Sequence, residues 1–340
     1  MRRRLLVELH LACPPDRFVR LGAGLLARIG DDPRPRLLLA ELEGEAILLG
    51  RHQRAASALD RKSVEDAGLP VFRRPGGGRA LTAGTGRLGL YLALPQPDAL
   101  LDSPIPTDRV INRYVRGLLA GLARAGAEQG AHYFGRDFVS SESRQLARLS
   151  QEGRADGATL FEGVVAVTES VELPPALGGY PVHSDPRAEG PPPVTLEELG
   201  GAPPAFPALV EAVVGGYEKA FGVQAEQVGD ATEPAAIEPP VWEEEGGFEE
   251  SGVADIPIGF AEALVRHDGE RLRAVRFRGD FIAPSFTVRA MEEELVGLPL
   301  SFPALGERVD AIFRRPGAGI LGVRGLRIFP DAVLAAAGKV

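Results

Sequence analysis

Three consecutive glycines between arginines constrain this chain more than any other feature. They lie in the run Arg-Arg-Pro-Gly-Gly-Gly-Arg-Ala at 73–80, directly after the apolar stretch 69–72 that predicts the start of a strand. Glycine lacks a side chain, so the backbone can turn sharply and present successive N–H groups to a ligand. Arg74 and Arg79 can add bidentate contacts to a carboxylate or phosphate. The run predicts a loop that enters the main pocket of a sheet, with its N–H groups pointing inward. A tight strand connection with exposed arginines is the alternative.

The pattern of apolar residues around this loop predicts an α/β fold with a central mixed or antiparallel sheet flanked by helices. A hairpin is expected over 37–50, where two apolar runs flank an acidic turn that contains Gly44. An amphipathic helix is expected over 107–126, capped by Thr107 and closed by Gly126. The other expected elements are a first strand at the N-terminus, a helix over 57–68, a strand over 88–94, a strand or hairpin over 158–173, a long loop over 178–205 and a helix over 206–221.

Residues 222–251 differ in composition from both flanking regions. They are acidic, rich in glycine and without periodicity, which predicts a linker or surface loop more mobile than its surroundings. We therefore expect a large domain over 1–225, a linker over 226–253 and a small α+β domain over 254–340. The elements expected in the small domain are strands over 261–266 and 272–277 around the turn 267–270, and helices over 285–296, 302–314 and 328–337.

Composition excludes several classes of protein. The net charge is −9, which disfavours a general nucleic-acid surface. No apolar run reaches the length of about 20 residues that spans a bilayer, and the N-terminal stretch lacks the apolar core of a secretory signal. The single cysteine, Cys13, permits no internal disulfide and suits a reducing compartment, so we expect a cytoplasmic protein. The five histidines show no metal-ligand spacing, and no tightly bound metal is expected.

The glycine-rich run is part of a longer series of motifs. Gly-Arg-His-Gln at 50–53 precedes it, and a strand follows it over 88–94. This order resembles the lipoate–protein ligase A and octanoyltransferase family, which shows a GRxQ element and then RRxTGGRAVxH or RRxSGGGAVxH. Gly-Arg-Asp at 135–137 looks like the family's GRND element, and Gly-Asp-Phe at 279–281 looks like an element of its accessory domain.

The resemblance implies a class II synthetase-like sheet with a small C-terminal accessory domain. It also implies a protein that binds a lipoyl or octanoyl group, alone or as an acyl-adenylate, with ATP and magnesium as cofactors. The implied partner is a lipoyl carrier domain of the glycine-cleavage H protein or 2-oxoacid dehydrogenase E2 type. The residues at the matching positions of the acyl and adenylate site are Arg51, His52, Arg73, Arg74, Gly76, Gly77, Gly78, Arg79, Ala80, Arg136 and Asp137.

The chain departs from the family where the ligases keep their lysine. That lysine lies in a KxxGxA element and holds the acyl carboxylate and phosphate. Its position falls on Gln145, and the glycine of the element falls on Arg148. Glutamine is neutral and cannot replace a point charge in a dry site. Arg144 or Arg148 could reach in instead, and a shift of one residue in the alignment would put Arg144 at the lysine position. The sequence therefore predicts weak or absent ligase activity.

The octanoyltransferase branch is not matched either. Its nucleophilic cysteine lies well beyond the glycine loop, whereas Cys13 lies near the opposite end of the domain. Ser184 is a conceivable substitute, but a hydroxyl nucleophile needs an oriented base. Gly76 stands where the motif has threonine or serine, and Ala83 stands where it has histidine.

Three hypotheses remain open from the sequence. The first is a ligase or acyltransferase that binds a lipoyl or octanoyl group and acts on a carrier domain. The second is a non-catalytic binding or regulatory paralogue that kept the scaffold and lost acyl transfer. The third is another acyl or biotin-like ligase that uses different polar groups.

Overall fold

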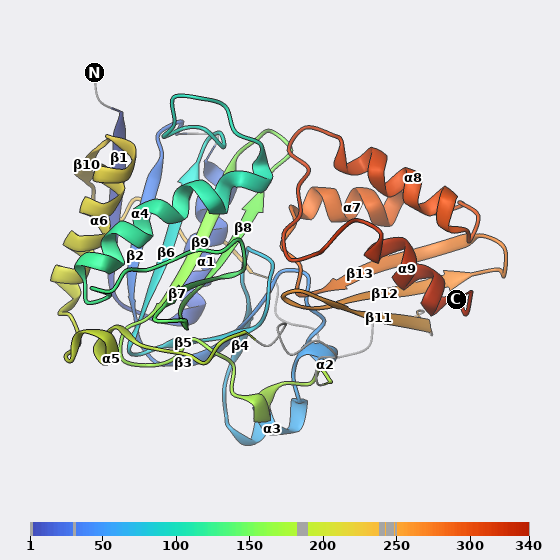
Figure 1. Ribbon diagram of the computed structural model, residues 1–340, viewed down its shortest axis with the longest axis horizontal. Coiled ribbons are helices and arrows are strands. Elements are labelled where there is room, and N and C mark those ends of the chain that lie inside the picture. The colour runs from blue at the N-terminus through green and yellow to red at the C-terminus, as the bar shows by residue number, and fades with distance from the viewer. Residues whose placement is uncertain are drawn as a thin grey trace.

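A seven-stranded mixed sheet forms the centre of the large part of the molecule (Figure 1). The structure, a computed structural model, describes residues 3–29, 32–181, 190–237, 242, 248 and 250–339. The strand order is β10-β1-β2-β6-β9-β8-β7, parallel from β10 to β2 and antiparallel from β2 to β7. The strands are β1 (Arg4–Cys13), β2 (Arg36–Leu42), β6 (Arg87–Leu94), β7 (Phe138–Ser141), β8 (Arg144–Gly153), β9 (Thr159–Ala166) and β10 (Gln224–Gln227). The predicted α/β class is confirmed.

Helices cover both faces of this sheet because its inner strands are apolar on both faces. In β2, Leu37 and Leu39 pack into the core under the helices α4 (Val110–Arg124) and α6 (Phe206–Phe221). The alternate residues Leu38 and Ala40 pack into a second core with α1 (Pro15–Arg28). The predicted helix over 206–221 is confirmed. The predicted cap at Thr107 is wrong, because 107–109 form a 3₁₀ turn whose N-cap is Pro106.

A three-stranded sheet, ordered β4-β3-β5, lies at one edge of the large part and carries the glycine-rich run (Figure 1). Its strands are β3 (Glu45–Leu49), β4 (Val71–Arg73) and β5 (Leu81–Gly84). The predicted hairpin over 37–50 is wrong. Its two halves belong to different sheets, since β2 pairs with β1 and β6 while β3 pairs with β4 and β5. The chain changes sheets at Gly44, where φ is +86°.

The helix predicted over 57–68 is split into α2 (Ala55–Ala58) and α3 (Arg61–Asp66). Leu59 interrupts it, because this buried residue is extended and bridges Gly178. The loop predicted over 178–205 contains one short helix, α5 (Leu196–Gly200), capped by Thr195. Residues 182–189 of that loop lie outside the described part of the chain.

The C-terminal part is an antiparallel sheet β11-β12-β13 packed against three helices (Figure 1). The strands β12 and β13 and their turn were predicted, whereas β11 begins inside the predicted linker. The second half of β10, which extends the large sheet, also lies in the predicted linker. Much of the remaining linker lies outside the described residues. The elements are β11 (Glu250–Ile256), β12 (Gly259–His267), β13 (Leu272–Gly279), α7 (Ser285–Glu294), α8 (Phe302–Phe313) and α9 (Ile328–Ala336).

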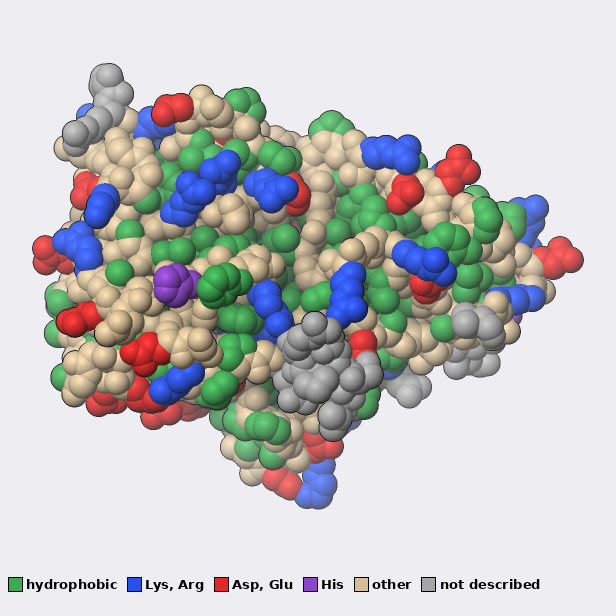
Figure 2. Space-filling view, viewed as in Figure 1, with side chains coloured by type: hydrophobic (Ala, Val, Ile, Leu, Met, Phe, Trp, Pro, Cys, Tyr) green, Lys and Arg blue, Asp and Glu red, His purple; other side chains and the backbone are tan. Residues whose placement is uncertain are grey.

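One apolar core continues from the large sheet into the C-terminal part. The seam between the two parts is also polar: the Arg54 guanidinium donates to the buried Glu262 carboxylate at 2.6 Å. On the face shown in Figure 2, basic side chains lie on both sides of this seam. Among the described residues, no helix is both long and apolar enough to cross a membrane.

Candidate functional site

The glycine-rich loop is buried between the large sheet and the C-terminal part. The N–H of Gly76 donates to Glu162 Oε2 at 3.3 Å, and the N–H of Gly78 donates to the Phe281 carbonyl at 3.1 Å. The Ser150 hydroxyl donates to the Gly77 carbonyl at 2.8 Å. The loop therefore does turn inward, but the protein's own acceptors occupy these two N–H groups.

Close packing explains why this loop needs glycine. A Cβ at Gly76 would lie 2.2 Å from Ser150 Oγ, and a Cβ at Gly77 would lie 2.5 Å from the Phe281 carbonyl oxygen. Gly78 has a φ of +86°, in the left-handed region that L side chains rarely adopt. Hence the run is required for the fold of this chain, in addition to any role toward a ligand.

The two arginines before the glycines support the loop. Arg73 donates to the carbonyls of Gly50, Arg51 and Gln53 at 2.6–3.0 Å. Arg74 is buried and donates to Glu162 at 3.2 Å and to the Arg79 carbonyl at 2.9 Å. Burial raises the pKa of Glu162, against the opposing effect of Arg74.

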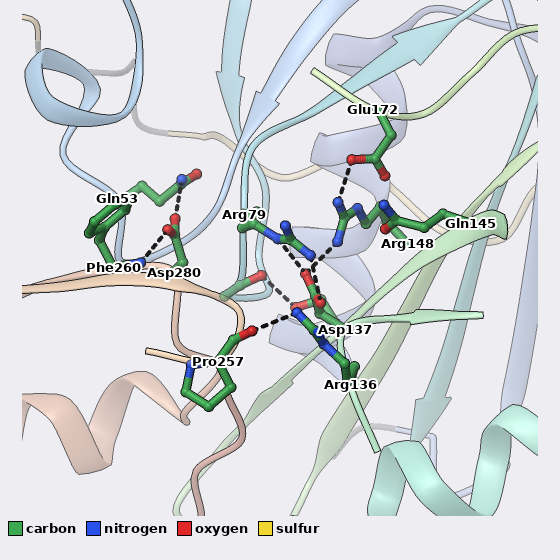
Figure 3. Close-up of polar contacts among 12 residues, drawn as sticks. Gln53, Arg79, Arg136, Asp137, Gln145, Arg148, Glu172, Pro257, Phe260 and Asp280 are labelled. Atoms are coloured by element: carbon green, nitrogen blue, oxygen red, sulfur yellow. Dashed lines mark hydrogen bonds and ion pairs between the residues drawn. The ribbon is translucent and has the colours of Figure 1, made fainter. Parts of the chain in front are cut away.

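The third loop arginine enters a buried ionic network (Figure 3). Asp137 accepts from Arg79 at 3.0 and 3.1 Å and from Arg148 at 2.7 Å, and Arg148 also pairs with Glu172. Burial alone would raise the pKa of Asp137, but Arg79 and Arg148 outweigh it and hold that pKa well below its usual range. The sequence placed Arg79 and Asp137 in the site, whereas their direct pairing and the second contact of Asp137 with Arg148 become evident only in the fold. Arg136 precedes Asp137 in the Gly-Arg-Asp element, and it donates to the Pro257 carbonyl at 2.5 Å.

Gln145 lies on β8 beside Arg148 and is also buried (Figure 3). Its amide Nε2 donates to the Pro191 carbonyl at 2.5 Å. Its Oε1 is buried without a hydrogen-bond partner within the described part of the chain. Residues 190–193 thus cover the side chain at the lysine position.

The Gly-Arg-His-Gln element meets the C-terminal Gly-Asp-Phe element. The His52 Nε2–H donates to the Ala283 carbonyl at 2.8 Å, and its ring stacks on Phe281 with centroids 5.1 Å apart. Gln53 donates to Asp280 at 2.6 Å. Burial lowers the pKa of His52 to about 3, so this imidazole is neutral and structural. Burial also raises the pKa of Asp280 to about 7.

A cavity of about 690 Å³ opens beside the glycine loop. Glu152, at the end of β8, accepts from the N–H and the hydroxyl of Ser285, both at 2.8 Å. The Arg51 Nε donates to the same hydroxyl at 3.3 Å. Burial raises the pKa of Glu152 to about 7. The residues that line this cavity are Ala23, Leu26, Ala27, Arg51, Arg73, Pro75, Glu152, Gly153, Arg154, Ala155, Asp156, Ala236, Ile237, Ser285 and Phe286.

Sequence reasoning identified Arg51 and Arg73 among these residues and missed Glu152 and Ser285. No local signal pointed to Glu152, because it follows Ser150 and Gln151 at the polar end of β8. No signal pointed to Ser285 either, because it reaches the cavity only through the packing of the C-terminal part. Two other candidates lie elsewhere. Cys13 is buried in the core under α1, where burial raises its pKa to about 11, and Ser184 lies outside the described residues.

The resemblance implies ATP with magnesium, but the glycine-rich loop and the cavity beside it are poorly complementary to a nucleotide phosphate. The N–H groups of Gly76 and Gly78 are bonded within the protein, and Glu152 places a carboxyl in the cavity where a phosphate would need donors. Among the residues that the structure describes, no group of three His, Cys, Asp or Glu side chains is placed to hold a metal ion. The N–H groups of Gly76 and Gly78 are therefore unavailable to an adenylate phosphate, and Arg51 is a donor that the cavity offers in their place.

The chain is similar to known proteins in sequence and in fold. A family model, the lipoyl protein ligase A/B catalytic domain, matches residues 20–171. A search of curated proteins finds no match. P. falciparum LipL1, solved in complex with lipoate, has a TM-score of 0.69 and 13% identity, with 97% of this chain and 98% of that chain covered.

Two further solved structures are similar to about two thirds of the chain. A bipartite lipoate–protein ligase of Thermoplasma acidophilum, described with its E2 lipoyl domain, has a TM-score of 0.52 and 14% identity over 67% of this chain and 87% of that one. A lipoate–protein ligase A bound with ATP has a TM-score of 0.52 and 12% identity over 67% and 89%. Residues 20–171 therefore match the model of the lipoyl protein ligase A/B catalytic domain, and the chain as a whole has the fold of a lipoate–protein ligase.

Proposed function

We propose that this protein binds a lipoyl or octanoyl group in the cavity beside the glycine loop and docks with a lipoyl carrier domain, without ATP-dependent transfer of the group. The cavity is the observation that carries the binding part. Its volume of about 690 Å³ falls within the range of about 300–1,000 Å³ that small-molecule pockets occupy.

The lining of the cavity suits an acyl chain with a polar end. Leu26, Ile237 and Phe286 supply apolar surface, while Arg51 and Glu152 supply polar groups. Burial of an eight-carbon chain against such walls is favourable by about 0.8 kcal/mol per CH₂ group.

The absence of acyl transfer is inferred from the buried side chains beside the glycine-rich loop. Adenylate chemistry needs preorganised positive charge where negative charge develops, and Gln145 supplies none. Arg148 is charged, but Asp137 and Glu172 neutralise it. These contacts favour a binding protein over a ligase.

An active ligase or transferase is the second candidate, favoured by the fold and by the position of Arg51 in the cavity. In that case Arg51 would provide the charge that the lysine provides in the family. Transfer of the acyl group to a carrier domain separates the two candidates.

The test combines binding with transfer. Octanoate and lipoate are titrated into the full-length protein by calorimetry, and the protein is then incubated with ATP, magnesium, either acid and a lipoyl carrier domain. We expect heat of binding and, by intact mass, no acylated carrier. Ala23→Trp, which fills the cavity, should abolish binding, whereas Ala120→Trp on α4, which does not line the cavity, should retain it.

Docking of the carrier is measured in the same material by titrating the carrier domain alone. Binding of neither acid would contradict the proposed ligand. Efficient acylation of the carrier would establish the second candidate.

A further inference from the structure

The polar end of the cavity combines one donor and one acceptor. Glu152 Oε1 accepts from the N–H groups of Ser285 and Gly153, at 2.8 and 3.0 Å, while Oε2 accepts from the Ser285 hydroxyl at 2.8 Å. A carboxylate oxygen can accept two hydrogen bonds, so Oε2 has room for one more. The Arg51 guanidinium lies against the same hydroxyl, with Nε 3.3 Å from it.

The other guanidinium groups of the cavity already donate to the protein. Arg73 donates to three backbone carbonyls near residue 50. Arg154 donates to the carbonyls of Leu26 and Ala27 and to Asp156. Within the described part of the chain, no hydrogen bond engages the terminal nitrogens of Arg51, which leaves them as donors toward the cavity.

We propose that this end of the cavity recognises a secondary amide, the bond that joins an acyl group to a lysine side chain. The protein would then bind the acylated form of its carrier in preference to the free fatty acid. The inference rests on the proposed binding of an acyl chain in this cavity and names the form in which that chain arrives.

Matching of donors and acceptors supports this choice. A secondary amide offers one N–H and one carbonyl oxygen, which pair with Glu152 and Arg51 respectively. A free carboxylate offers acceptors only, so it would bind Arg51 but face the buried Glu152 carboxylate without a proton between them. Such a like-charge contact in a desolvated site disfavours the free acid.

The two ligands should respond to pH in opposite ways. The groups that face or surround Glu152 are Arg51, Arg73 and Arg154, the Asp156 carboxylate, and the Ser285 hydroxyl and N–H. Burial places the pKa of Glu152 at about 7. Above that value Glu152 is charged, repels a carboxylate and accepts from an amide N–H. Below it, the protonated group can donate to a carboxylate.

The experiment compares octanoate with N-butyl octanamide, a mimic of acylated lysine, by calorimetry on the full-length protein at pH 6 and pH 8. At pH 8 we expect the amide to bind about ten-fold more tightly or better, because one unsatisfied buried charge is worth at least that factor. The octanoate affinity should rise several-fold at pH 6, so that the difference narrows.

Glu152→Gln should remove the pH dependence and narrow the selectivity, whereas Glu211→Gln, an exposed carboxylate on α6, should change neither. The wild-type comparison at two pH values needs no variant and stands if Glu152→Gln does not fold. Equal or tighter binding of octanoate at pH 8 would overturn the inference while leaving acyl binding in place. Failure of both ligands to bind at either pH would overturn acyl binding itself.

Discussion

Asp137 illustrates how strongly this chain depends on a few buried charges. Its carboxylate is 2% exposed and accepts from two guanidinium groups, those of Arg79 and Arg148. Removing charges from water is costly, and the cost is offset only when each has a partner in good geometry. The network joins Glu172, which follows β9, and Arg79 of the glycine-rich loop to Asp137, which precedes β7, and to Arg148 on β8.

Replacing Asp137 with asparagine should destabilise the fold. The two arginines would keep their charge in a buried site with one carboxylate fewer, and breaking such a pair costs about 3–5 kcal/mol. The free energy of unfolding, from urea denaturation, measures this. The matched control is Asp66→Asn, which breaks an exposed pair with Lys62 and should cost about 0–1 kcal/mol. Equal losses for the two variants would show that the network contributes no more than a surface pair.

Gln145→Lys alone should not produce carrier acylation. The new ammonium would lie under residues 190–193 and beside Arg148, outside the described lining of the cavity. A preorganised donor is worth about 2.7–4 kcal/mol in such reactions, but only when it reaches the developing charge. Intact mass of a carrier domain, after incubation with ATP and octanoate, measures the outcome. The double variant Gln145→Lys with Arg148→Gly tests whether the filled interior is the obstacle. Acylation of the carrier by the single variant would contradict the prediction.

Three segments far apart in the sequence form one structural unit around the glycine loop. The element at 50–53 lies on one side, the glycines at 76–78 lie in the middle, and 279–283 of the C-terminal part close the other side. Main-chain hydrogen bonds join them: Gly78 N–H to the Phe281 carbonyl at 3.1 Å and Gly279 N–H to the His52 carbonyl at 2.9 Å. The motifs of the sequence are therefore contact points between elements.

Gly77→Ala should weaken the contact between the loop and the C-terminal part. The added Cβ would meet the Phe281 carbonyl oxygen at 2.5 Å and the Ile282 Cα at 3.0 Å, both of them backbone atoms that cannot rotate away. Overpacking of this kind costs about 1–3 kcal/mol. Gly325→Ala is the control, because nothing lies within 4 Å of its Cβ position. The free energies of unfolding of the two variants, measured by urea denaturation, should differ by that amount. A Gly77→Ala midpoint equal to that of the wild type would show that the loop can shift.

The molecule as a whole has one continuous core, and it also buries several carboxyl groups. Burial makes the ionised form of such a group unfavourable. Burial raises the pKa of Glu152 and Asp280 to about 7, and both lie at the seam between the large sheet and the C-terminal part. The folded protein therefore binds more protons than the unfolded chain between about pH 4 and about pH 7. The contribution of these groups to the free energy of unfolding is complete below about pH 4 and is lost as the pH rises through about 7. Asp137, with its lowered pKa, acts in the opposite sense only at more acidic pH.

Asp280→Asn should reduce the slope of stability against pH between about pH 5 and pH 8. An amide stays neutral, so the proton uptake of Asp280 is removed. The free energy of unfolding is measured in urea at several pH values across this window. Asp268→Asn is the control, because hydrogen bonds lower the pKa of Asp268 to about 2 and its titration lies below the window. An unchanged slope in Asp280→Asn would indicate that Asp280 is ionised throughout.

Local sequence was sufficient for elements whose partners are near or whose pattern is long. The helix α6 and the pair β12–β13 follow from periodicity and turn residues, and the glycine run predicted a loop that turns inward and carried the resemblance to a family. The pairing of β2 and β3 could not be predicted, because an apolar alternating strand accepts any neighbour with a matching face. The short strands β10 and β11 are polar or glycine-containing and depend on long-range pairing.

The candidate site also contains residues that local sequence predicts and contacts that only the tertiary structure reveals. Arg51 and the glycine loop were evident from motifs, since their residue types and spacing are local properties. The cavity and the network around Asp137 join distant segments: Glu152 and Ser285 are 133 residues apart, and Arg51 and Ser285 are 234 residues apart. Whether an arginine faces a ligand or a buried carboxylate depends on which distant side chains packing brings to it. That is why the sequence could name Arg74 and Arg79 as candidates, while only the tertiary structure decided that both pair within the protein.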